Sequence, residues 1–89
     1  MDNDAAPELN FPCEYPIKVI GQDEDDFFDF VIDLVTRHAP EVMPHEFSVN
    51  RSSGGKYAAV SVTIIAASRD QVNALYKEMG EHKRIKVAF

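Results

Sequence analysis

The segment from Arg51 to Tyr57 gathers residue types that could bind an anion. It combines two cations, two serine hydroxyls and two adjacent glycines. Successive backbone N–H groups in a turn can form a concave nest for a carboxylate or a phosphate. The candidate residues are Arg51, Ser52, Ser53, Gly54, Gly55, Lys56 and Tyr57. The alternative is a plain hairpin loop, which needs glycine for its geometry and charge for solubility. The glycine and lysine spacing is not that of a Walker phosphate loop.

His38 is the second candidate, because it ends an apolar helical pattern just before Pro40. A histidine there can titrate near neutral pH or contact a ligand. The alternative is a helix end where a cation is favoured by the helix dipole. The other histidines and Cys13 are too widely spaced to suggest a metal site. We therefore expect neither a metal nor another cofactor.

The sequence gives no support for catalysis. The motifs G-x-S-x-G and H-E-x-x-H are absent, and Asp25, Asp29 and Asp33 lie opposite an apolar stripe, where they are solvated. Small enzymes of the acylphosphatase type need an arginine-bearing phosphate loop after their first strand. In this chain, the acidic segment 21–24 follows the first strand and would repel phosphate. We expect no enzymatic activity, and a small phosphate-directed enzyme stays as the alternative.

The elements that position these residues follow from hydrophobic periodicity. Alternation predicts strands at 14–20, 47–50, 57–66 and 84–89. Apolar spacings of three and four predict helices at 23–38 and 68–80. Four acids at 23–26 suit the positive end of the first helix, and Ser68 with Gln71 has the spacing of a capping box. Gly21 is expected to end the first strand.

The element order βαββαβ predicts an α+β fold, a ferredoxin-like sandwich. Right-handed crossovers and a central hairpin give a four-stranded antiparallel sheet in the order 4-1-3-2, with two helices on one face. The strand residues expected to face the helices are Ile17, Val19, Phe47, Val49, Val60, Val62, Ile64, Ile85 and Val87. Those expected on the outer face are Lys18, Ile20, Ser61, Thr63, Ile65, Lys86 and Ala88.

The residue types on the outer face favour some kinds of partner over others. RNA-binding domains of this fold stack bases on aromatic residues of that face. The expected outer residues are instead small or aliphatic, and a net charge of −6 repels phosphate backbones. We expect no nucleic-acid partner. A surface for a protein or small-molecule partner, a homodimer contact and a solvated face on a monomer all stay open.

The length of 89 residues indicates one domain, with 45% apolar and 27% charged residues. Residues 1–12 are expected to be a flexible acidic tail and 13–89 the folded domain. The acidic start is unlike a secretory signal, and no apolar run approaches the roughly 20 residues of a membrane span. A cytoplasmic protein without a membrane partner is expected.

Several short strings together resemble the YbeD-like family of small bacterial proteins over residues 11–89. They are Phe11-Pro12, Lys18-Val19-Ile20-Gly21-Gln22, His38-Ala39-Pro40, Ser52-Ser53-Gly54-Gly55-Lys56-Tyr57, Val60-Ser61-Val62-Thr63-Ile64, Gln71-Val72 and Leu75-Tyr76. The resemblance implies a ferredoxin-like fold similar to ACT domains, which sense small molecules in amino-acid metabolism. Some members are encoded near lipoate-attachment genes. A regulatory or adaptor domain that binds a metabolite or a partner protein is the function that this resemblance implies.

Overall fold

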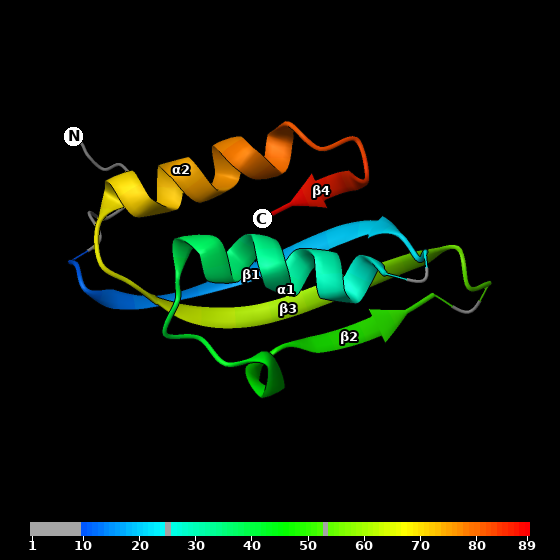
Figure 1. The fold of residues 1–89 in the computed structure, drawn as a ribbon, viewed down its shortest axis with the longest axis horizontal. Coiled ribbons are helices and arrows are strands. Elements are labelled where there is room, and N and C mark those ends of the chain that lie inside the picture. Colours follow the sequence, from blue (N-terminus) through cyan, green and yellow to red (C-terminus); the bar gives the residue numbers. More distant parts are fainter. Residues whose placement is uncertain (1–9, 25, 53) are drawn as a thin grey trace, which may run out of the picture.

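The computed structural model describes residues 10–24, 26–52 and 54–89. The elements are β1 (Cys13–Gln22), α1 (Phe27–His38), the short 3-10 helix η1 (Pro44–Glu46), β2 (Ser48–Arg51), β3 (Tyr57–Ala66), α2 (Arg69–Gly80) and β4 (Ile85–Ala88). The strands form one antiparallel sheet in the order β2-β3-β1-β4, and both helices pack on the same face of it (Figure 1). The predicted βαββαβ order and strand order 4-1-3-2 are confirmed.

The sheet is built on a long central ladder. β1 and β3 pair over ten positions, from Cys13 opposite Ala66 to Gln22 opposite Tyr57. β2 pairs only with residues 58–61 of β3, and β4 pairs with β1 only near its C-terminal end. Among the described residues, no further strand flanks the half of the ladder formed by 13–17 and 62–66.

The core lies between this sheet and the two helices. Alternate residues of β1 and β3 are buried, and they meet one apolar stripe from each helix. The largest fully buried side chains are Phe27, Leu34, Ile64, Leu75 and Met79. Ile17, Val19, Phe47, Val60, Val62 and Ile64 are buried as predicted, while Val49 and Ile85 are partly buried against the same core.

The predicted faces of β4 are wrong in part. Val87 was expected to face the helices, but it lies opposite Ile20 on the outer face and is 47% exposed. Ala88, expected outside, lies opposite Val19 and packs against the core. A β-bulge beside Ile20 and Gly21 causes this, because one extra residue in a strand reverses the side-chain alternation beyond it.

Gly21 continues β1 instead of ending it, and it sits at the bulge. A Cβ atom at this position would lie 2.4 Å from the carbonyl oxygen of Arg84 and 2.5 Å from the ring of Phe27. Only glycine therefore lets β4 and the start of α1 approach β1 this closely.

The first helix begins later than predicted, at Phe27. Asp23 and Glu24 form a turn, in which the Asp23 N–H donates to the carbonyl oxygen of Lys56 at 2.8 Å. α2 begins as expected, since the Ser68 Oγ accepts the Gln71 N–H at 3.1 Å. Residues 1–9 of the predicted tail lie outside the described residues, whereas Phe11 packs against the core.

Candidate functional site

Polar groups of the hairpin between β2 and β3 form hydrogen bonds with one another. The Ser52 N–H donates to the Tyr57 carbonyl at 2.9 Å, and the Ser52 Oγ accepts the Tyr57 N–H at 3.2 Å. Gly55 has φ of +72°, a conformation that favours glycine. Gly54 is exposed, and Ser53 lies outside the described residues. These contacts favour the plain hairpin explanation.

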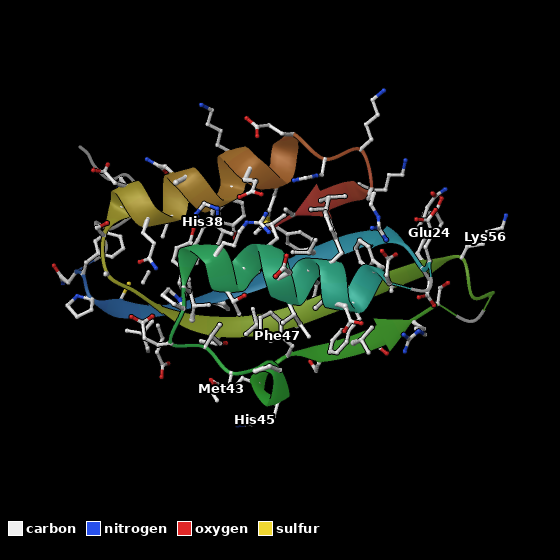
Figure 2. The ribbon with its side chains drawn as sticks, in the orientation of Figure 1. Glu24, His38, Met43, His45, Phe47 and Lys56 are labelled. Atoms are coloured by element: carbon white, nitrogen blue, oxygen red, sulfur yellow. The ribbon has the colours of Figure 1, made fainter. Side chains whose placement is uncertain are left out.

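The charges around the hairpin also weaken an anion site. The Arg51 Nε donates to the Asp23 carboxylate at 2.9 Å, so this cation already has a partner. Asp23 and Glu24 line the same shallow hollow as Lys56, and Figure 2 places Glu24 and Lys56 at the same end of the molecule. A bound anion would meet two carboxylates there. Anion binding at this hairpin stays a prediction that the local charge disfavours.

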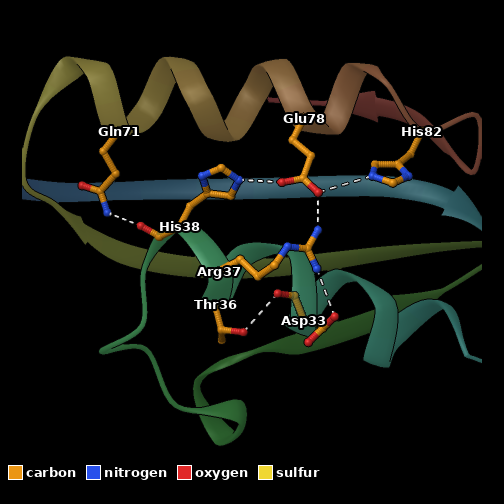
Figure 3. Close-up of polar contacts among 7 residues, drawn as sticks. All are labelled: Asp33, Thr36, Arg37, His38, Gln71, Glu78 and His82. Carbon is orange, nitrogen blue, oxygen red and sulfur yellow. Dashed lines mark hydrogen bonds and ion pairs between the residues drawn. The ribbon is translucent and has the colours of Figure 1, made fainter.

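His38 lies in a polar cluster that joins the two helices (Figure 3). Its Nε2 is 2.7 Å from Oε1 of Glu78 on α2, and Arg37 pairs with the same carboxylate. The His82 Nε2 lies 3.5 Å from Glu78, and the Gln71 side-chain amide donates to the His38 carbonyl at 2.7 Å. His38 thus ties the end of α1 to α2.

Glu78 is the centre of this cluster, and it is not among the site residues predicted from the sequence. The hydrogen bond from His38 contributes most to lowering the pKa of Glu78 to about 2, and Arg37 and His82 contribute less. The i,i+4 spacing of Glu78 and His82 was the one sequence signal available. Its main partner lies 40 residues away, at a distance in sequence that no local pattern reveals.

The outer face of the sheet carries an apolar surface that no described helix covers. Val87 lies opposite Ile20, and Phe89 exchanges both backbone hydrogen bonds with Lys18, so it shares the face of Lys18. The outer-face surface comprises Glu14, Pro16, Lys18, Ile20, Gln22, Ser48, Asn50, Tyr57, Ala59, Ser61, Thr63, Ile65, Val87 and Phe89. This face therefore bears two aromatic residues, Tyr57 and Phe89, and neither belongs to the outer set predicted from the sequence. The Lys18 Nζ lies 6.0 Å from the centre of the Phe89 ring.

Two hollows border this surface. The first, of about 430 Å³, lies on the outer face where β2 begins and β4 ends, and Lys18, Thr63 and Phe89 help to line it. The second, of about 500 Å³, runs beside β3 beyond the end of β2, and Val42, Glu46 and Thr63 help to line it. Thr63 thus belongs to both hollows.

Two further features concern metals and membranes. Within residues 10–24, 26–52 and 54–89, no three His, Cys, Asp or Glu side chains are grouped closely enough to hold a metal ion. Neither described helix has the length and apolar character needed to cross a membrane.

Comparisons with known proteins place the chain among uncharacterised bacterial proteins. The family described as "Protein of unknown function (DUF493)" matches residues 6–89. A UPF0250 protein of Pseudomonas aeruginosa is 39% identical over 80 residues, which cover 89% of this chain and 86% of the relative. A UPF0250 protein of Chromobacterium violaceum is 31% identical over 87 residues, or 98% of each chain.

A solved structure supports the fold. The solution structure of protein HP0495 from H. pylori superposes with a TM-score of 0.70 at 16% identity, over all of this chain and 94% of that one. At this identity the likeness concerns the fold alone. The family match over residues 6–89 and the identities above 30% lead to one assignment: the chain belongs to the DUF493, or UPF0250, family of small YbeD-like bacterial proteins of unknown function.

Proposed function

We propose that this protein is a non-enzymatic adaptor domain that docks a partner protein on the outer face of its sheet. One observation carries the proposal. Five large apolar side chains are strongly exposed in the described part of the chain, and four of them, Tyr57, Ile65, Val87 and Phe89, lie on this face. Large apolar side chains gathered on one exposed face of a small domain are typical of an interaction site.

The chemistry between these apolar residues suits a protein interface. Ala59, Ser61 and Thr63 lie between them and carry no charge, while Lys18, opposite Ser61, and Glu14, opposite Ile65, contribute one charge of each sign to this face. The core of a protein interface is depleted in charged residues and enriched in aromatic ones. The net charge of −6 resides largely on other parts of the chain, which leaves this face suited to a close, weakly charged contact.

The experiment is affinity capture from native cells with matched surface variants. Val87→Lys and Phe89→Ser alter the outer face, whereas Met43→Ser removes an equally exposed apolar residue from the loop before η1 (Figure 2). We expect one partner to be recovered with the wild type and Met43→Ser and lost with both face variants. Equal recovery with Val87→Lys and Phe89→Ser would reject docking on this face.

A small carboxylate is the second candidate, because the hollow on the outer face contains a cation beside an aromatic ring. Lys18, Ser61 and Thr63 offer polar contacts, Phe89 offers an apolar wall, and Glu46 is the one acidic residue in the lining of this hollow. A thermal-shift panel of amino acids, lipoate and related acids tests this version. A ligand at 100 times its Kd stabilises the folded state by about 2.7 kcal/mol. The shift should disappear in Lys18→Met, and a flat panel counts against this candidate.

The phosphate-directed enzyme is less well supported. Arg51 is paired with Asp23, and Glu24 follows in the turn after β1. An incoming phosphate would be repelled by both carboxylates. Acyl phosphate hydrolysis that is lost on Arg51→Ala would restore this alternative.

A further inference from the structure

The backbone of β3 is open along the half that β2 does not reach. The Ser52 N–H donates to the Tyr57 carbonyl, so Tyr57 presents its backbone groups toward β2. In an antiparallel ladder, alternate residues present these groups to the same side. Thr63 and Ile65 therefore direct their N–H and C=O groups to the side of β2, which begins at Ser48 opposite Ser61. No described residue makes a backbone hydrogen bond to them on that side.

The corresponding edge of β1 is closed to strand pairing. Lys18 exchanges hydrogen bonds with Phe89, at 2.6 and 2.9 Å, so the same alternation directs the backbone of Pro16 toward that edge. Proline has no N–H, and proline on an edge strand prevents further pairing. The two edges of this half of the ladder are thus unequal, because β3 keeps donors and acceptors on its side where β1 has lost a donor on the other.

A groove runs along this open edge of β3. It is the hollow of about 500 Å³, and the loop between α1 and β2 forms its far wall with Ala39 and the buried Val42. Three carboxylate residues, Glu14, Glu41 and Glu46, line it, with no lysine or arginine among its lining residues. The groove combines an apolar floor, an acidic rim and an unpaired strand edge.

We infer that this edge binds an extended basic segment of a partner protein, which adds a fifth strand beside β3 at Thr63 and Ile65. The inference rests on the proposed adaptor function and names the chemistry of its partner. In strand addition, main-chain hydrogen bonds supply affinity and alternate side chains supply specificity. One set of the partner's side chains enters the apolar groove, and lysine or arginine residues meet the acidic rim.

Charge also argues against two other occupants of the open edge of β3. A second copy of this chain paired edge to edge would bring two acidic rims together, and like charges repel. The N-terminal segment of the chain carries Asp2, Asp4 and Glu8, which the same rim would repel. Phe11, which leads into β1, lies on the side of α2, with its ring centre 5.8 Å from the Arg69 guanidinium.

Amide exchange of the full-length protein tests the inference. The probe is a synthetic ten-residue peptide that alternates valine and lysine, and its control replaces every lysine with glutamate. We expect the lysine peptide to slow exchange at the amides of Thr63 and Ile65, with weaker binding as salt is raised. The glutamate peptide should leave both amides unprotected.

Two variant pairs separate backbone pairing from charge. Ile65→Pro removes the edge N–H and should weaken peptide binding about tenfold, whereas Ile65→Val keeps it and should bind normally. Glu41→Lys should weaken binding about threefold. Glu81→Lys makes the same charge change beyond α2 and should have no effect.

Three results would overturn the inference. They are protection of the Thr63 and Ile65 amides in the free protein, equal binding of the two peptides, and wild-type affinity in Ile65→Pro. The outcome is separable from the proposed function. If Val87→Lys abolishes partner capture while Ile65→Pro does not, docking on the outer face stands and strand addition fails. If the peptide pairs with β3 while Val87→Lys and Phe89→Ser capture normally, outer-face docking fails.

Discussion

Replacing Glu78 with glutamine should change how the stability of the protein depends on pH. The carboxylate of Glu78 joins α2 to His38 and Arg37 on α1, and these contacts lower its pKa from 4.5 to about 2. A carboxyl group whose pKa is lower in the folded than in the unfolded chain stabilises the fold above the unfolded pKa. That stabilisation is lost as the pH falls from about 4.5 toward 2, and Glu78→Gln never has it.

The expected size follows from the pKa and from exposure. One unit of pKa corresponds to about 1.36 kcal/mol, so the full shift sets an upper bound of about 3.4 kcal/mol. The side chain of Glu78 is 24% exposed and that of Arg37 is 48% exposed, so water and salt screen the pairing. We therefore expect about 1–2 kcal/mol at pH 6, more than half of it lost by about pH 3.

Urea unfolding from pH 6 to pH 2 measures this effect. The quantity of interest is the free energy of unfolding of the wild type minus that of Glu78→Gln, because other carboxyl groups titrate in both proteins and largely cancel. Glu81→Gln, an exposed acid just beyond α2, is the control and should give a small, constant difference. A wild-type advantage over Glu78→Gln that does not shrink between pH 6 and pH 2 would refute the reasoning.

Substitutions at three further positions test the packing and the cap of α2 by the same unfolding measurement. Gly21→Ala should cost about 1–3 kcal/mol, because the new methyl group meets the Arg84 backbone and the Phe27 ring, and an unchanged midpoint would contradict the close approach at the bulge. Ser68→Ala should cost about 1 kcal/mol through loss of the cap on α2, while Ser68→Asp should retain most of that stability. Leu75→Ala should cost about 2–5 kcal/mol, because its side chain is fully buried; a loss under 1 kcal/mol would place it outside the core.

The element order could be predicted because it depends on local patterns. Alternation marks β3, and the spacing of Val72 and Leu75 marks α2, whatever lies elsewhere in the chain. The orientation of β4 could not be predicted in this way. It depends on the bulge at Gly21, which is set by contacts with Phe27 and β4 and not by alternation.

The acids after β1 show the same limit. Because the helix dipole favours acids at a helix start, residues 23–26 were expected to begin the first helix. Instead, Asp23 accepts a hydrogen bond from Arg51 beside the hairpin, and α1 begins at Phe27. His38 was correctly placed at a helix end, but its partner Glu78 is a tertiary contact. The open edge of β3 could have been predicted, because the predicted strands 47–50 and 57–66 already differ in length.

The ten-residue central ladder also has a kinetic consequence. It pairs residues 35 to 53 positions apart, from Gln22 with Tyr57 to Cys13 with Ala66. Forming such pairs requires closing a long loop before any contact is gained, which slows folding in proteins rich in distant contacts. The β2–β3 hairpin is local and can form early, whereas β1 must wait until α1, β2 and β3 are present. During synthesis, β3 therefore emerges from the ribosome with β1 already outside, and the sheet is completed only when β4 follows.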